Sequence, residues 1–119
     1  MAARILIVED DPTRLSVFRE ELDGRDLEIA SSVAEALRRL EGPRFELIFL
    51  DHDLEFGARV YIDPYEENTG YQVAKHLSAR PEYAEVPIVV HSLNWFGANK
   101  IVKMLANAVY VPFGIYPIA

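Results

Sequence analysis

Acidic residues stand directly after two apolar segments that are far apart in the sequence. Glu9 and Asp10 follow the run of residues 4–8, and Asp51 follows the run of residues 45–50. If these runs are neighbouring strands of a parallel sheet, their carboxyl ends meet at one edge and the three carboxylates converge. Unpaired carboxylates a few ångströms apart repel each other, and a hard divalent cation with oxygen ligands relieves that repulsion. We therefore predict a Mg²⁺ or Mn²⁺ site at Glu9, Asp10 and Asp51.

Two histidines lie next to polar residues at the ends of apolar runs. His52 adjoins Asp51, and His91 ends the run of residues 86–91 just before Ser92. Histidine is the commonest general acid or base, so it could activate water and protonate a leaving oxygen when a cyclic phosphodiester is hydrolysed. Strand alternation offers a structural alternative, because His91 turns toward a sheet face if Ser92 points at the site. Both roles stay open for His91.

The elements that position these residues alternate between short apolar runs and amphipathic stretches. This pattern is typical of a parallel sheet with helices on both faces. We expect strands at residues 4–8, 27–30, 45–50, 86–91 and 108–111, with helices between Pro12 and Gly24, between Ser32 and Gly42, and at 69–79 and 95–107. Residues 55–68 form a long polar and aromatic loop. The pattern predicts an α/β fold: one domain over residues 1–119, with a doubly wound, five-stranded parallel sheet in the order 2-1-3-4-5.

The amino-acid composition limits the kinds of ligand that the chain can bind and indicates its cellular compartment. Nineteen acidic residues against twelve basic ones give a formal charge of −7, which opposes binding to long nucleic acid. The chain has no cysteine, so disulfides and thiolate metal sites are excluded. No segment has the apolar stretch of a signal peptide, and no segment has the ~18 consecutive apolar residues that a membrane span needs. We expect a cytoplasmic protein that does not associate with membranes.

The run ILIVEDDP followed by LIFLD resembles the response-regulator receiver family, a CheY-like superfamily of two-component phosphorelays, over most of the chain. The resemblance implies a flavodoxin-like fold in which Glu9 and Asp10 bind Mg²⁺. It implies that Asp51 is the phosphoacceptor, taking a phosphoryl group from a histidine kinase or a phosphotransfer protein. Asp53 falls where the family uses a backbone carbonyl as a further metal ligand, and Ser92 would hydrogen-bond a phosphoryl oxygen.

The sequence also departs from the receiver pattern. Receivers carry a lysine before Pro-Phe at the end of the fifth strand, and here Val111 precedes Pro112 and Phe113. Residues 55–68 stand where receivers have a short turn. The fifth helix, part of the usual dimerisation face, is expected to be missing. An apolar sheet face without that helix would invite self-association or another partner.

The motifs in which this sequence differs from ordinary receivers resemble a divergent receiver branch that is named for the processing of cyclic phosphates. The matching motifs are LDHDL, TGYQVA and VVHS, with Asn94 soon after. Metal-dependent cyclic-phosphate processing, as a phosphodiesterase or phosphohydrolase, is therefore our first expectation, with Asp51, His52, His91 and Ser92 as catalytic residues. A stand-alone response regulator phosphorylated on Asp51 is the second. A pseudo-receiver that binds a protein partner without phosphorylation is the third.

Overall fold

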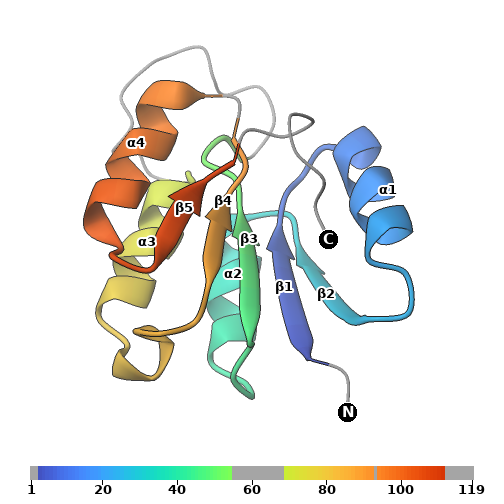
Figure 1. Cartoon of the computed structure of the whole chain (residues 1–119), viewed down its shortest axis with the longest axis horizontal. Coiled ribbons are helices and arrows are strands. Elements are labelled where there is room, and N and C mark those ends of the chain that lie inside the picture. Colours follow the sequence, from blue (N-terminus) through green and yellow to red (C-terminus); the bar gives the residue numbers. More distant parts are fainter. Residues whose placement is uncertain (1–2, 55–68, 93, 112–119) are drawn as a thin grey trace.

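The computed structural model describes residues 3–54, 69–92 and 94–111. Five parallel strands form one sheet in the order β2-β1-β3-β4-β5 (Figure 1). They are β1 (Arg4–Val8), β2 (Asp26–Ala30), β3 (Leu47–Leu50), β4 (Ile88–Val90) and β5 (Ala108–Tyr110). The predicted flavodoxin-like, receiver-like sheet and its strand order are confirmed.

Four α-helices connect the strands within the described part of the chain. They are α1 (Pro12–Glu21), α2 (Val33–Leu40), α3 (Gly70–Ser78) and α4 (Trp95–Met104). A short 3₁₀-helix, η2 (Pro81–Tyr83), precedes β4 and was not predicted from the sequence. The predicted long loop at 55–68 and the predicted lack of a fifth helix after residue 111 both lie outside the described residues. None of the described helices is long and apolar enough to cross a membrane.

The sheet carries a different apolar core on each face. One core packs α1 against β1 and β3, mainly through Phe18 and Phe49, whose ring centroids are 5.1 Å apart. The other core is larger and packs α2, α3 and α4 against the opposite face. In Figure 1, α1 (blue) stands apart from α3 and α4 (yellow to orange). Burial on both faces explains why β1 and β3 are almost continuous apolar runs.

Strand register places the expected site residues side by side. Val8 of β1 pairs with Leu50 of β3, and Leu50 pairs with Val90 of β4. Glu9, Asp51 and His91 are therefore the first residues beyond three adjacent strands. Their backbones continue the ladder, because the Asp51 amide donates to Val8 O at 3.1 Å and the His91 amide to Leu50 O at 3.1 Å.

Gly70, the first residue of α3, packs directly against the end of β3. A Cβ atom at this position would lie 1.9 Å from the carbonyl oxygen of Asp51. We expect Gly70→Ala to lower the free energy of unfolding by ~3 kcal/mol, since overpacking forces backbone to move. Gly42→Ala is the control, because its Cβ would meet only an ordinary contact at 3.5 Å. Urea unfolding of both variants measures the difference, and equal stability would show that α3 does not press on Asp51 in solution.

Candidate functional site

Glu9 is completely buried, and all of its carboxylate contacts hold it in the charged form. Arg14 binds it with both ends of its guanidinium, through Nε to Oε1 at 2.9 Å and Nη2 to Oε2 at 3.0 Å. His91 Nε2 lies 2.8 Å from Oε1, and the Asp11 amide donates to Oε2 at 2.9 Å. Burial alone would raise the pKa of Glu9, but the hydrogen bonds from His91 and Arg14 outweigh it and hold the pKa at about 2. Glu9 is therefore a fixed negative charge.

Asp51 is 1 % exposed and has a weaker set of partners than Glu9. Arg14 Nη2 is 3.4 Å from its Oδ2, and Ser92 forms a side-chain hydrogen bond with it. Burial, followed by the negative charge of Glu9, raises the pKa of Asp51 to about 8, although Arg14 acts in the opposite direction. When Asp51 is ionised, the two carboxylates therefore carry one more charge than Arg14 compensates.

His91 belongs to the core and to the site at the same time. Its ring meets the ring of Phe18 edge-on in the core on the α1 face, with centroids 5.0 Å apart. Strand alternation does turn His91 toward a sheet face, and the imidazole still reaches Glu9. Burial lowers the pKa of His91 below its ordinary value, although Glu9 acts in the opposite direction. A neutral ring beside an ionised carboxylate must donate from Nε2, because the carboxylate can only accept.

The three buried side chains meet the donor requirements of a divalent cation. Glu9, Asp51 and His91 each offer one ligand atom, and these atoms lie within 4.8 Å of one another. Carboxylate oxygens suit Mg²⁺ and Mn²⁺, and imidazole suits Mn²⁺ better than Mg²⁺. Burial and the negative charge of Glu9 both disfavour ionised Asp51, so a cation beside it would stabilise the ionised carboxylate. The residues therefore fit the divalent ion that was expected from the sequence.

His52 and Asp53 form a second group next to this trio. His52 Nδ1 lies 2.7 Å from Asp53 Oδ1, and the Asn94 amide donates to the same oxygen at 3.0 Å. Asn94 also begins α4, because its Oδ1 accepts from the Gly97 amide at 3.0 Å. A Cβ atom on Gly97 would lie 2.5 Å from Cγ of His52, so the glycine leaves room for the imidazole. A carboxylate at Nδ1 fixes the tautomer and the orientation of the ring.

The expected site residues thus divide into two adjacent groups. Glu9, Asp51, His91 and Ser92 come together, while His52 and Asp53 lie beside them with Asn94. The Asp10 amide donates to Glu9 Oε2 at 3.1 Å, but its carboxylate does not join the buried trio. Metal ligation by Asp10 and Asp53 stays a prediction from the receiver resemblance.

Arg14 is the functional side chain that the sequence reasoning missed. It is the third residue of the helix that Asp11 caps, so it lies just beyond the end of β1. The first turn of a helix favours acidic residues, because the peptide dipole places partial positive charge there. A basic residue at that position is therefore a usable signal that its side chain has a partner outside the helix.

The free energy of unfolding of the metal-free protein should depend on pH over a range that the pKa of Asp51 sets. Its folded pKa of about 8 exceeds the ordinary 3.8, so below about 8 the folded form keeps a proton that the unfolded chain releases. The lowered pKa of His91 gives the opposite slope below its ordinary 6.5 and offsets Asp51 there. Stability should therefore fall as pH rises from about 6.5 to about 8, by up to ~1.4 kcal/mol per pH unit.

Urea unfolding at several pH values, with chelator present, measures this slope. Asp51→Asn should remove the slope, and Asp23→Asn, at an exposed position, should keep it. A wild-type stability that does not change between pH 6.5 and 8 would contradict the raised pKa of Asp51.

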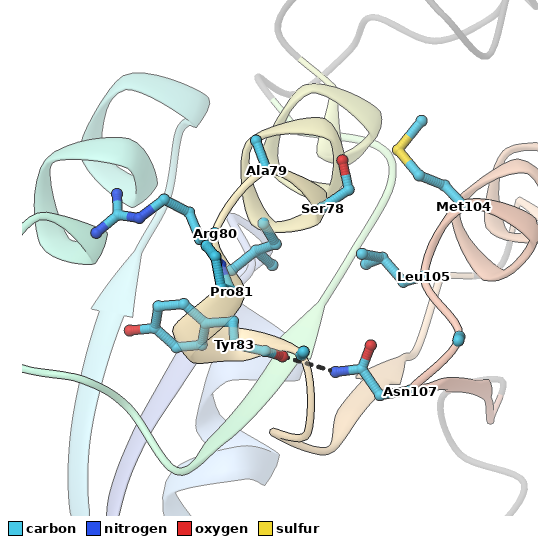
Figure 2. A pocket seen from close by; sticks show the side chains of 11 residues that line it. Ser78, Ala79, Arg80, Pro81, Tyr83, Met104, Leu105 and Asn107 are labelled. Carbon is cyan, nitrogen blue, oxygen red and sulfur yellow. Dashed lines mark hydrogen bonds between the residues drawn. The ribbon is translucent and has the colours of Figure 1, made fainter.

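The described residues also line a hollow of about 260 Å³ at the opposite edge of the sheet. It lies between the end of α3, η2 and the segment that follows α4, as Figure 2 shows. Asn107 closes one side by donating to the carbonyl of Tyr83 at 3.0 Å. Its described lining contains Arg80 but no carboxylate or histidine, so this hollow lacks the acid–base and metal-binding groups found around Asp51.

The fold and the cluster at the strand ends together define a response-regulator receiver domain. A family model described as "Cyclic-phosphate processing Receiver domain" matches residues 4–107. The chain belongs to this family. No individual curated protein sequence matches it.

Solved receiver structures share the fold at low sequence identity. The Mn²⁺-bound form of response regulator Rcp1 has a TM-score of 0.73 at 21% identity, over 96% of this chain and 83% of that one. The CheY-like receiver domain protein from Methanospirillum hungatei JF-1 gives 0.71 at 23%, over 98% and 86%. The receiver domain of a sensor histidine kinase from Pseudomonas aeruginosa PAO1, with a magnesium ion in its active-site cleft, gives 0.74 at 21%, over 98% and 89%.

Proposed function

We propose that this chain is a divalent-metal-dependent domain that hydrolyses a cyclic phosphate at the carboxyl edge of its sheet. The observation that carries the proposal is the buried trio of Glu9, Asp51 and His91, whose ligand atoms lie within 4.8 Å of one another and in which burial and the charge of Glu9 raise the pKa of Asp51 to about 8. The family description supports a cyclic phosphate as the substrate class. The Mn²⁺ and Mg²⁺ in two receiver structures of the same fold support the choice of ion.

The carboxylates of Glu9 and Asp51 are the metal ligands that we infer, with Asp10 and Asp53 as further ligands. A bound cation would polarise the phosphoryl oxygens and offset the negative charge that develops during attack. His91 positions Glu9 through the hydrogen bond of 2.8 Å. Ser92, which is bonded to Asp51, is placed to donate to a phosphoryl oxygen beside it.

His52 is the general acid and base in this proposal, oriented by Asp53 and Asn94. It accepts a proton from water as the water oxygen bonds to phosphorus. It returns that proton to the ring oxygen as the bond between this oxygen and phosphorus breaks. One water is consumed, and the product is a phosphomonoester with a free hydroxyl group, so no other reactant is needed.

Phosphorylation of Asp51 is the second candidate function, and the bond between Asp51 and Ser92 favours it. In this alternative a histidine kinase or phosphotransfer protein would be the partner. Val111 opposes it, because it stands where receivers carry the lysine that pairs with the phosphoryl group. The cytoplasmic location and self-association or partner binding through the sheet face that lacks a fifth helix stay predictions.

The test is a substrate panel with and without Mg²⁺. Nucleoside 2′,3′-cyclic phosphates, 3′,5′-cyclic phosphates and a linear phosphodiester are each incubated with the chain, and products are separated by liquid chromatography. The proposal expects a cyclic substrate to be opened with Mg²⁺ and left intact with chelator. Acetyl phosphate is tested in parallel by mass spectrometry. Stoichiometric labelling of Asp51 without turnover of any cyclic phosphate would favour the second candidate.

A further inference from the structure

We infer that Arg14 is the phosphate-binding cation of this site, and that it competes with the divalent metal for the carboxylates of Glu9 and Asp51. The inference rests on the proposed function and specifies how the site selects its ligand. In the present structure the guanidinium holds both carboxylates, at 2.9 and 3.0 Å for Glu9 and 3.4 Å for Asp51. These are the oxygens that a metal would need.

Among the residues that the structure describes, no lysine takes the place of the receiver lysine at the strand ends. Val111 stands where receivers carry a lysine at the end of β5. Lys100 and Lys103 do not replace it, because both lie on α4, and Lys100 Nζ is over the ring of Phe96 at 5.6 Å. Arg14 reaches the same cluster from α1. Its planar guanidinium suits phosphate oxygens better than a lysine does, because it can donate two parallel hydrogen bonds.

Arg14 is also the most exposed member of the cluster. Its side chain is 25% exposed, against 0% for Glu9 and 2% for Asp51. Arg14 is therefore the member of this ion-paired group that solvent reaches most readily. Helix stability does not explain a basic residue in the first turn of α1, since the helix dipole disfavours it there.

The net charge of the cluster predicts opposite effects of Arg14 on metal binding and on anion binding. Ionised Glu9 and Asp51 with Arg14 sum to −1, and a divalent cation changes this to +1. If Asp10 also binds the cation, each sum falls by one. In both cases the loss of Arg14 lowers the charge of the cluster by one unit, which favours a cation and disfavours an anionic phosphate. Removal of Arg14 should thus strengthen metal binding and weaken anion binding.

Isothermal titration calorimetry with Mg²⁺, and then with inorganic phosphate at saturating Mg²⁺, tests this. Arg14→Met should bind Mg²⁺ ~5-fold or more tightly, because a like charge is removed at close range. It should bind phosphate ~10-fold or more weakly, the usual scale for a lost charged hydrogen bond. Arg14→Lys, which keeps the charge without the fork, should fall between Arg14→Met and the wild type. Arg19→Met is the control, at an exposed position on the same helix.

Thermal melts establish that each variant is folded, and Arg14→Gln replaces Arg14→Met if the latter is not. Unchanged affinities for both ligands, or weaker binding of both, overturn the inference while the proposed function stands. Mg²⁺ binding by Arg14→Met but not by the wild type supports the competition and contradicts the proposed function. If neither protein binds Mg²⁺, both are wrong.

Discussion

Asp51→Asn is expected to weaken Mg²⁺ binding by ~100-fold or more, because a carboxylate and a divalent cation in contact attract by several kcal/mol even at an effective dielectric of ~20. Turnover of the cyclic phosphate should be lost with the metal. Metal-free Asp51→Asn should nevertheless be more stable than the wild type at pH 8, since the substitution removes a charge that burial and repulsion by Glu9 both destabilise. Calorimetry and urea unfolding measure the two effects.

Asp53→Asn is the matched control for this experiment. Its side chain is 46% exposed and lies outside the buried trio, and the variant keeps the backbone carbonyl that the receiver resemblance implicates in metal binding. We expect its Mg²⁺ affinity to change by less than ~10-fold, the lower range for residues that support a ligand. Equal losses in Asp51→Asn and Asp53→Asn would mean that the trio is not the centre of the metal site.

His52→Ala should lower the turnover rate by ~100-fold or more, the usual scale for losing a general acid or base. His91→Ala should lower it to a similar degree for a different reason, because Glu9 loses one of the hydrogen bonds that fix it. The pH profile separates the roles. The acidic limb of the profile should vanish in His52→Ala and persist in the His91 variant.

Two further variants complete the histidine experiment. His91→Gln should recover part of the activity, because an amide can still donate to Glu9. His76→Ala is the control, as this third histidine lies on α3 and pairs with Arg80 and Glu41 rather than with the site. Full activity in His52→Ala would remove His52 from the mechanism, and failure of the Gln variant would assign His91 a direct part in the reaction.

The fold could be predicted largely because local signals agreed with each other. The three strands β3, β4 and β5 are continuous apolar runs, and β1 is one after Arg4. Asp11 with Pro12, and Ser32, begin α1 and α2 as expected. The convergence of Glu9 and Asp51 followed from one rule, that ligands gather where parallel strands end. η2 gave no such signal, because three residues are too few to show a helical period.

The site was harder to predict because its contacts depend on side-chain reach. The side chain of Arg14 reaches from the first turn of a helix to carboxylates at the ends of two strands. No periodic pattern in the sequence indicates such a contact. The backbone pattern correctly turned His91 toward a sheet face, but it gave no indication that the imidazole also reaches Glu9. Likewise, Asp10 and Asp51 look alike in sequence, and only the structure separates a half-buried carboxylate from one that is fully enclosed.

Phosphorus-31 NMR of a nucleoside 2′,3′-cyclic phosphate mixed with the chain and Mg²⁺ tests the central claim most directly. The method resolves the cyclic substrate, the ring-opened monoester and an aspartyl phosphate in one sample. We predict that the monoester signal grows with the wild type, stays absent when chelator replaces Mg²⁺, and stays absent with Asp51→Asn. An unchanged cyclic-phosphate signal in the presence of wild-type protein with Mg²⁺ demonstrably bound would contradict the account.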